Sequence, residues 1–484
     1  MHKSFYYINR MIFLAAIIVS ALAAVIPLSC SDAAELAFEI RGVDAKIAER
    51  LTDGNYNTYA SLGEDASIEL LCEKEIGSAY IVFDRVYGEF SLTDPDTGKS
   101  VRCGENGFLH TFLDVRALLG ENVRRVKLDF DTGEISLADL YLFGKGEVPA
   151  WVQKWKKPAD GDADLLLFSS HSDDEQLFFA GILPYYAGER GLNVQVVYFT
   201  NHYDVHNRPH EQLNGLWTVG VTVYPVIGEL PDLYSESLDT AIAQYRWAGY
   251  GEDDIVGIQV ELIRRFKPFV VVGHDVNGEY GHGAHRLNTY TLRQALELSG
   301  DKESYHDSAE KYGTWDVPKT YLHLWGENKI VMDWDEPLDS FGGRTAFEMT
   351  VEGYGCHLSQ HWTWFTRWLK GTDYAPITAA SQIKTYSPCE YGLYRTTVGA
   401  DAEKNDFFEN VDLKKTASEP AAPKQSEKMQ LAAIPGSLDK DGDFGEPSDV
   451  DLSRYYIVFA LCTAALSVLA IVLFRKRIFK TEEK

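Results

Sequence analysis

The sequence predicts an α/β protein: a doubly wound, mostly parallel sheet, preceded by an all-β sandwich and followed by one C-terminal transmembrane helix. Three observations predict this fold class. Apolar, strand-like segments such as Leu165–Phe168 alternate with helical segments after residue 163, which indicates a parallel sheet. Short β-type runs separated by polar turns fill residues 35–147. The apolar segment 455–474 carries no charge and is long enough to span a bilayer.

The two ends of the chain predict export and anchoring. A basic start and the apolar run 11–28 are typical of a secretory signal sequence, predicted over residues 1–34 and either cleaved or kept as an anchor. Basic residues follow the segment 455–474, and such a flank marks the cytoplasmic side of a span. We therefore expect a single-pass protein of the cell membrane, with an extracellular catalytic domain and a cytoplasmic tail at 475–484.

The net charge restricts the kinds of binding partner, and the cysteines suggest possible disulfides. The formal net charge of −26 argues against nucleic acid or an anionic membrane surface as the main partner. Six cysteines are present, and two of them lie in the apolar ends. The other four are Cys72, Cys103, Cys356 and Cys389. They allow three disulfide pairings, of which closeness in the sequence favours Cys72–Cys103 and Cys356–Cys389.

Residues 35–147 are predicted to form the sandwich. Runs such as 79–83 and 137–142 are separated by polar turns at sandwich-like intervals. The segment Leu51–Thr58 resembles the loop near the start of discoidin-like, galactose-binding β-sandwich domains. This resemblance implies glycan binding in some relatives and a purely structural role in others, so both remain open. Residues 148–162, which contain prolines and tryptophans, form a connector.

The first stretch that carries chemistry is His171-Ser172-Asp173-Asp174-Glu175. It lies between the predicted strand 165–168 and a predicted helix over 176–190. Its side chains are therefore expected at the carboxyl end of a strand, where open α/β sheets bind their ligands. An imidazole beside two carboxylates is costly to bury unless a divalent metal compensates the charge.

The second stretch is Gly281-His282-Gly283-Ala284-His285, which follows the apolar run 269–272 and precedes a predicted helix over 286–298. Two histidines three residues apart at the start of a helix share one face. A single histidine on such a loop is more often a hydrogen-bonded structural residue. Two polar stretches at two strand ends of one sheet make a metal site the stronger interpretation.

Together these stretches resemble the PIG-L/LmbE family of metal-dependent de-N-acetylases. The first motif of that family usually reads His-Pro-Asp-Asp-Glu, and here Ser172 replaces the proline. The resemblance is clear over about 163–290 and continues weakly to Glu409, so that a deacetylase-like domain is expected over 163–410. It implies a Rossmann-like sheet and one zinc ion per chain, although another divalent metal remains open.

The resemblance also implies roles for individual residues. The metal ligands would be His171, Asp174 and His285, which leave coordination positions open for catalysis. Asp173 would be the general base, and a protonated His282 would stabilise the oxyanion of the tetrahedral intermediate.

Four further residues are assigned around this centre. Glu175 and Asp275 are expected to orient the ligands, and Arg208 matches a family position that lines the sugar pocket. His357 is expected either to touch substrate or to pack in the core.

The spacing of His202, His206 and His210 suggests a stripe of metal ligands on one helix face. Pro209 breaks the helix that such a stripe needs, so solvated or substrate-edge positions are expected for the three histidines.

These observations predict removal of N-acetyl groups from an N-acetylglucosamine-type sugar or glycan at the outer cell surface. The alternative is a surface glycan-binding protein whose deacetylase domain is inactive, and the intact ligand and base set argues against it. Residues 411–453 are rich in Lys, Glu, Ala, Pro and Ser, and are predicted to be a flexible tether between this domain and the membrane.

Overall fold

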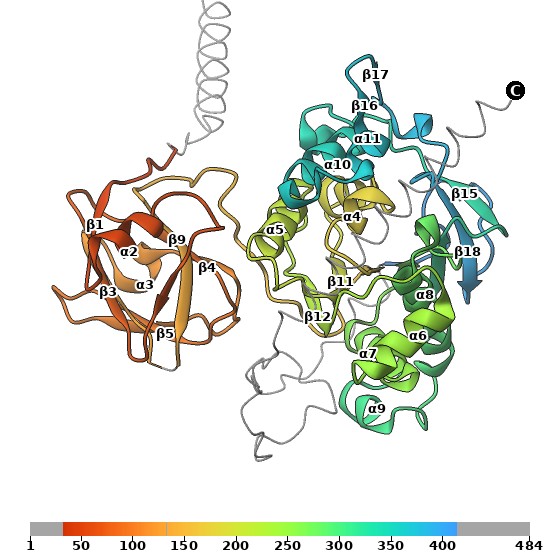
Figure 1. Cartoon of the computed structure of the whole chain (residues 1–484), viewed down its shortest axis with the longest axis horizontal. Helices are drawn as coiled ribbons and strands as arrows, with labels where there is room; N and C mark the ends of the chain where they lie inside the picture. The colour runs from red at the N-terminus through yellow and green to blue at the C-terminus, as the bar shows by residue number, and fades with distance from the viewer. Residues whose placement is uncertain (1–31, 132, 414–484) are drawn as a thin grey trace, which may run out of the picture. The chain divides into compact units, whose positions relative to one another are not determined.

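The computed structural model describes residues 32–131 and 133–413 (Figure 1), which belong to one compact unit. Almost all of the predicted signal sequence (1–34) and tether (411–453) lies outside these residues. The predicted tail (475–484) does so completely. Location outside the cell therefore stays a prediction.

The predicted fold class needs a correction. Within the described ranges, no helix is both long and apolar enough to cross a membrane, so the transmembrane helix of the prediction is not supported. The segment 455–474, on which that expectation rested, lies outside the described residues. An apolar run of sufficient length is compatible with a span but does not by itself produce one. The large sheet is mixed, with five parallel strands and an antiparallel end, and the N-terminal sheets are antiparallel.

The N-terminal region is a sandwich of two antiparallel sheets. The first sheet contains, in spatial order, β1 (Phe38–Arg41), β3 (Ser67–Cys72), β8 (Arg125–Asp129), β5 (Phe90–Thr93) and β6 (Ser100–Cys103). The second contains β2 (Ala60–Leu62), β9 (Ile135–Phe143), β4 (Ser78–Phe83) and β7 (His110–Leu113). Two short helices, α2 (Ala45–Arg50) and α3 (Val115–Leu119), complete the region.

Period-two alternation builds the core of this sandwich. In β3, Ile68, Leu70 and Cys72 are buried while their neighbours are partly exposed, as expected for a strand with one face on the core. β4 is buried on both faces. Its residues Tyr80 and Val82 belong to one buried hydrophobic cluster with Val152 of the connector.

The second region is built on a seven-stranded mixed sheet. Its spatial order is β12 (Val226–Leu230), β11 (Val194–Thr200), β10 (Leu165–Ser169), β13 (Val270–Gly273), β14 (Lys319–His323), β18 (Glu390–Thr396) and β15 (Lys329–Val331). The first five strands are parallel. β18 runs antiparallel to both β14 and β15, so the last two strands form an antiparallel extension.

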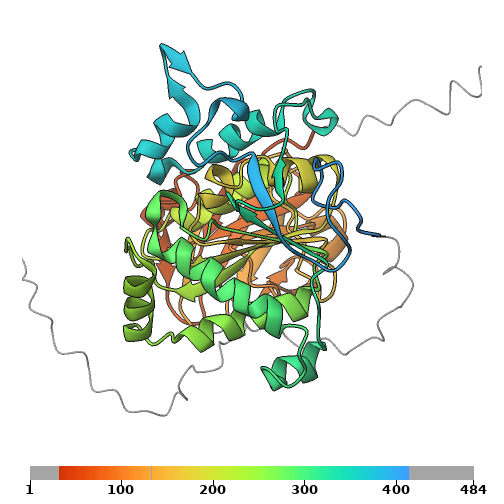
Figure 2. The same ribbon diagram turned by 90° about the vertical axis from the view of Figure 1, so that its right-hand side faces the viewer.

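Helices cover both faces of this sheet (Figure 2). One face carries α6 (Leu238–Trp247), α7 (Glu252–Phe266) and α8 (Gly283–Leu298). The other carries α4 (Asp174–Leu177), the π-helix η1 (Pro184–Glu189), α5 (Arg208–Thr218) and α10 (Ala346–Gly355). The remaining elements are α9 (His306–Tyr312), α11 (Trp364–Lys370), β16 (Gly371–Thr372), β17 (Ala375–Pro376) and the 3-10 turns η2 (Glu279–Gly281), η3 (Asp339–Phe341), η4 (Leu358–Gln360) and η5 (Ala380–Gln382).

The side chains of β10 alternate between the two hydrophobic cores, one on each face of the sheet. Leu165 and Leu167 join the core on the α4 face, whereas Leu166 and Phe168 join the core on the α7 face. All four side chains are fully buried, because a central parallel strand has helices on both sides. The helix expected over 176–190 is broken, since Gly181 has a φ of +88° and lies against the ring of Trp334, where a Cβ would clash.

The carboxyl end of β10 is where the strand order reverses. From β10 the chain first adds β11 and β12 on one side, and then returns to place β13 on the other side. In open α/β sheets the crevice at such a point is the usual ligand site. The turn after β10 and the turn after β13 both open there, so the topology brings the two predicted motifs together.

The sandwich and the α/β region share a buried seam at α5. His110 Nε2 of β7 lies 2.8 Å from His210 Nδ1 of α5, and His110 Nδ1 lies 2.7 Å from Tyr80 Oη. Asp84 pairs with His206 Nδ1 at 2.6 Å. His206 and His210 are thus interdomain contacts, which corrects the expectation of solvated or substrate-edge positions for them.

The predicted disulfides are absent. Cys72, Cys103, Cys356 and Cys389 are all free thiols in the structure, so neither favoured pairing forms. Three of the four are buried, and burial raises the pKa of Cys72 and Cys103 to about 11. These thiols therefore behave as small apolar core residues.

Candidate active site

The turn after β10 carries the first motif under backbone strain. Asp173 has φ +130° and ψ −22°, a conformation that side chains with a Cβ rarely adopt. The Asp173 backbone N–H donates to Glu175 Oε2 at 2.9 Å, and Glu175 Oε1 lies 3.0 Å from His357 Nε2. Glu175, predicted to orient the metal ligands, therefore holds the strained turn at Asp173 in place.

His357 lies behind this turn. Its side chain is fully buried, and Glu175 raises its pKa against the opposing effect of burial. The structure gives His357 a supporting position for the Asp173 backbone, not the exposed position that contact with substrate requires. Of the two readings left open by the sequence, core packing agrees with this placement.

Three atoms from the two motifs form a nearly equilateral triangle. His171 Nδ1 lies 3.1 Å from Asp174 Oδ2 and 3.1 Å from His285 Nε2, and the last two atoms are 3.2 Å apart. Two imidazole nitrogens cannot bond each other through their lone pairs, but a cation between them satisfies both. A tetrahedral zinc ion with bonds of about 2.0–2.1 Å would separate its ligand atoms by about 3.3 Å. These residues therefore fit a divalent metal.

A second possible group, Asp174 with His274 and His285, is less suitable. Besides the triangle, two groups of three could surround an ion: this one, and His171 with His282 and His285. However, His274 Nε2 already accepts the Ser170 backbone N–H at 3.0 Å, and its Nδ1 faces a carboxylate. Both ring nitrogens of His274 are occupied, so it supports the site without binding the metal.

Glu279 is the centre of a buried network that the sequence did not reveal. Its Oε2 accepts from His285 Nδ1 at 2.7 Å and from His274 Nδ1 at 2.9 Å. Its Oε1 accepts from His323 Nδ1 at 2.6 Å and from the Asp275 backbone N–H at 3.1 Å. A proton on His285 Nδ1 leaves the Nε2 lone pair aimed at the triangle, which is the usual arrangement around a metal-binding histidine.

The charge of Glu279 follows from these partners. Burial alone would raise its pKa, but the surrounding histidines, His274 first, hold the pKa well below its ordinary value. Asp275, which was expected to orient a ligand, instead accepts from Asn277 N at 3.1 Å within its own turn. Glu279 performs the role that the sequence assigned to Asp275.

Asp173 and Asp174 are adjacent, yet their surroundings separate them. Burial raises the pKa of Asp173 to about 7, although Arg208 opposes this with Nη2 3.9 Å from Oδ1. Burial acts in the same direction on Asp174, but His285 and His171 overcome it and hold its pKa well below the ordinary value. Asp174 is thus a permanent anion, while Asp173 can exchange a proton near neutral pH.

His282 caps the N-terminus of α8 and is neutral. Its Nδ1 accepts the Ala284 backbone N–H at 3.1 Å, and burial lowers its pKa to about 2. The expected protonated form is therefore not supported by its surroundings. The neutral ring still carries a proton on Nε2, and its centroid lies 4.7 Å from that of His171. It can donate one hydrogen bond into the site.

Arg208 enters the site from the start of α5. It donates from Nη1 to His202 Nδ1 at 3.0 Å and from Nη2 to the Ser172 carbonyl at 3.3 Å. His202 is almost fully buried, so it is a site residue rather than a solvated one. Arg208, predicted as a substrate contact in the sugar pocket, lies with Nη2 3.9 Å from Asp173 Oδ1.

Asp232 is a further site residue that was missed. Its Oδ1 lies 3.4 Å from His171 Nε2 and its Oδ2 3.4 Å from His202 Nδ1. Burial opposes ionisation, but His171, His202 and Arg208 lower the pKa of Asp232. The available signal was its place directly after β12, at the same sheet edge as the motifs.

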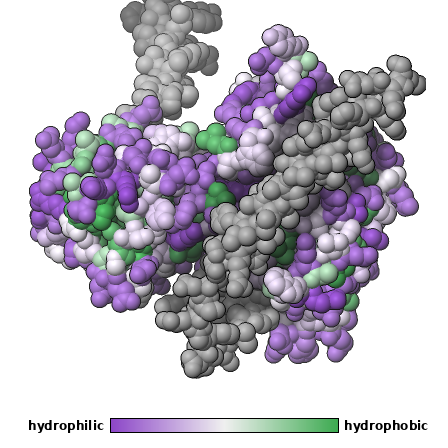
Figure 3. Space-filling view, viewed as in Figure 1, coloured by the Kyte–Doolittle hydropathy of each residue, from purple (hydrophilic) through white to green (hydrophobic). Residues whose placement is uncertain are grey.

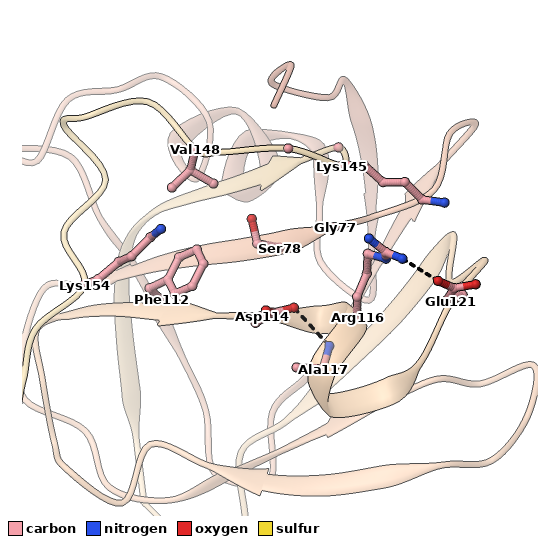
Figure 4. A pocket seen from close by; sticks show the side chains of 12 residues that line it. Gly77, Ser78, Phe112, Asp114, Arg116, Ala117, Glu121, Lys145, Val148 and Lys154 are labelled. Carbon is pink, nitrogen blue, oxygen red and sulfur yellow. Dashed lines mark hydrogen bonds and ion pairs between the residues drawn. The ribbon is translucent and has the colours of Figure 1, made fainter. Parts of the chain in front are cut away.

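A cavity in the sandwich is a separate feature (Figure 4). Its volume is about 400 Å³, and its lining includes Ser78, Phe112, Arg116, Lys145 and Lys154. Arg116 is paired with a carboxylate of the same lining, and Lys154 Nζ lies 4.9 Å from the centre of the Phe112 ring. The lining contains no imidazole or thiol, so this cavity cannot perform the chemistry of the histidine cluster.

Comparison with known proteins supports the deacetylase resemblance. No family model matches the chain. The chain is 28% identical over 180 residues to the 1D-myo-inositol 2-acetamido-2-deoxy-alpha-D-glucopyranoside deacetylase of Mycobacterium leprae, which covers 32% of this chain and 58% of the relative. The chain thus spans less than two thirds of the length of the curated relatives it matches.

Two solved structures are similar to separate parts of the chain. N,N'-diacetylchitobiose deacetylase from Pyrococcus horikoshii is 15% identical, with a TM-score of 0.32, and the match covers 48% of this chain and 84% of that one. A CBM32 module from Clostridium perfringens is 21% identical, with a TM-score of 0.19, over 23% of this chain and 94% of that one. The resemblance to PIG-L/LmbE de-N-acetylases is supported by the sugar deacetylases among the curated relatives.

Proposed function

We propose that the α/β region is a metal-dependent hydrolase that removes the N-acetyl group from an N-acetylglucosamine-type sugar or glycan. The observation that carries the proposal is the triangle of His171 Nδ1, Asp174 Oδ2 and His285 Nε2, with the carboxylate of Asp173 beside it. The similarity to sugar deacetylases supports the choice of substrate.

The donor set of two imidazoles and one carboxylate suits zinc. His171, Asp174 and His285 would hold the ion, which when bound supplies a Lewis acid and makes a water molecule more acidic. The reaction adds water across the amide C–N bond and releases acetate and a free amine.

The protein groups then divide the proton transfers. Asp173, whose pKa of about 7 suits exchange near neutral pH, takes a proton from the attacking water and gives it to the departing amine. His282 donates its Nε2 proton as a hydrogen bond to the oxyanion that develops on the acetyl group. Arg208 stabilises the ionised form of Asp173 and fixes its direction.

The direct test measures acetate release from N-acetylglucosamine and its oligomers. We expect release by the metal-loaded protein, loss after treatment with a chelator, and recovery when zinc is returned. Asp173→Asn serves as the matched control, because it should keep the metal and lose the activity. A fully metal-loaded protein that binds these sugars without releasing acetate would support the alternative, a glycan-binding protein with an inactive deacetylase domain.

A further inference from the structure

Exposed apolar side chains are frequent in one stretch of the α/β region. Ten large apolar side chains are exposed in the described part of the chain, and four of them lie between residues 358 and 374. These four are Leu358, Trp362, Trp364 and Tyr374. Figure 3 shows a surface that is mainly hydrophilic over the described residues, with some hydrophobic patches, several of them on the sandwich. Of these four, Trp364 is the one that ring contacts connect to the active site.

A continuous line of rings joins Trp364 to the histidines of the active site. The Tyr280 ring lies 5.4 Å from His282 and 5.6 Å from His285, centroid to centroid. Tyr280 also contacts Phe365 at 5.1 Å and Trp364 at 6.1 Å, and the last two rings are 4.1 Å apart. Tyr280 and Phe365 are partly buried, whereas Trp364 is 51% exposed. Trp364 therefore presents an open surface at the outer end of a fixed aromatic wall.

Besides Tyr280, a second tyrosine contacts the His282 ring. Tyr234 is 61% exposed, and its ring lies 5.2 Å from that of His282 at an interplanar angle of 81°. Tyr280 contacts the same imidazole at 72°. His282 is thus contacted nearly edge-on by Tyr234 and by Tyr280, which leads to Trp364. We call Tyr234 and Trp364 the aromatic rim.

The chemistry of the rim fits a neutral sugar ring. A pyranose has an apolar C–H face that stacks on an aromatic ring, while its hydroxyl groups stay in water. Tyr and Trp combine a large apolar area with few rotatable bonds, so they bind such faces at low entropic cost. Asp232, 39% exposed by its side chain, lies next to His171 and disfavours an acidic sugar at the same place.

We propose that the aromatic rim holds a second sugar residue, linked to the one that is deacetylated, so that the preferred substrate is a neutral oligosaccharide rather than a single sugar. This inference rests on the proposed deacetylase function. The rim lies outside the set of groups that would carry out the hydrolysis, so it affects the choice of substrate more than the chemical step.

The test compares N-acetylglucosamine with its tetramer. We expect kcat/KM for acetate release to be about ten- to a hundred-fold higher for the tetramer in the unmodified protein. Trp364→Ala and Tyr234→Ala should each lower that ratio about tenfold, mainly through KM, and Trp364→Phe should keep part of it. Trp247→Ala is the matched control, because Trp247 is 91% exposed on α6 and, among the described residues, its ring contacts none of the site rings.

A second measurement tests sugar binding by the aromatic rim independently of the proposed deacetylase activity. In the Asp173→Asn background, which should bind without turnover, calorimetry gives the affinity for the tetramer and for the monomer. Weaker tetramer binding after Trp364→Ala supports the rim even if no substrate is turned over. Equal tetramer-to-monomer ratios with and without Trp364 and Tyr234 would overturn the rim, whether or not acetate is released.

Discussion

The turn after β10 and the turn after β13 stand side by side in the sheet and use buried carboxylates in opposite ways. In the first, Asp173 is strained, and burial raises its pKa to about 7 although Arg208, 3.9 Å away, acts in the opposite direction. In the second, Glu279 is equally buried but accepts from three histidines, and its pKa is held well below the ordinary value. Burial is common to both, so the difference comes from the neighbouring donors.

This comparison indicates a division of labour. The β13 turn is a satisfied network that fixes ring orientation, and the β10 turn keeps one carboxyl group reactive. A reactive group needs an environment that does not fully stabilise either of its protonation states. The predictions below test this division, from the largest expected effect to the smallest.

Removing one metal ligand from each turn should have the largest effect. Asp174→Asn and His285→Ala should each lose most of the bound metal, because an amide is a poor ligand and alanine is none. Activity should fall to background in both. Elemental analysis of the purified variants, with acetate release, checks this. Full occupancy in either variant would remove that residue from the ligand set.

Asp173→Asn should keep the metal and lose the proton acceptor. General-base catalysis typically contributes about a hundred- to ten-thousand-fold, so turnover should fall by that order. The loss should appear in kcat more than in KM. If Asp173→Asn lost its metal while Asp174→Asn kept both metal and activity, the assignment of the two carboxylates would be reversed.

Glu279→Gln should weaken the site without removing a ligand. The amide cannot accept from three imidazoles as a carboxylate does, so the orientation of His285 is less fixed. Loss of such a partner typically costs about ten- to a hundred-fold in metal affinity. Competition with a chromogenic chelator measures the affinity. Unchanged affinity would show that His285 is oriented by packing alone.

The raised pKa of Asp173 predicts a pH-dependent stability difference. A carboxyl group whose pKa rises on folding stabilises the fold below its ordinary pKa and loses this contribution as pH rises through about 7. Metal-free Asp173→Asn should therefore gain stability over the metal-free parent at pH 8, by at most about 4 kcal/mol, and much less at pH 4. Thermal melts at both pH values check this, and a pH-independent difference would contradict it.

Asp275→Asn should have the smallest effect. The Asp275 side chain accepts from Asn277 within its own turn, and asparagine can accept in the same way. Metal affinity and turnover should stay within about twofold of the parent. A large loss would return to Asp275 the orienting role that the structure gives to Glu279.

Local pattern was sufficient to find both halves of the centre. A buried strand followed by a polar turn places its side chains at the sheet edge, and this held for His171 and for His285. The sandwich was likewise visible as alternating runs. These features depend on neighbours in the sequence, which is why the sequence could reveal them.

Features that depend on distant contacts were missed. Glu279 gains its role only because His323, from β14, and His274 meet it in the folded chain. Asp232 comes from the end of β12 and shows no motif of its own. The antiparallel β18 returns to the sheet after a long excursion from β14, and no local pattern sets its direction. The free cysteines show that closeness in the sequence does not bring two thiols together.

The buried contact between the sandwich and α5 affects how the two regions can be recombined in evolution. Helix α5 presents Arg208 to the active site and, within the next two residues along the chain, His210 to His110 of the sandwich. Burial lowers the pKa of both His110 and His210, so each remains neutral and depends on the other for a hydrogen bond. A sandwich with no histidine in the place of His110 would leave the buried His210 Nδ1 without this hydrogen-bond partner, two residues from Arg208, which acts on Asp173. We therefore expect related proteins to inherit the sandwich and the α/β region together, not as separately exchanged domains.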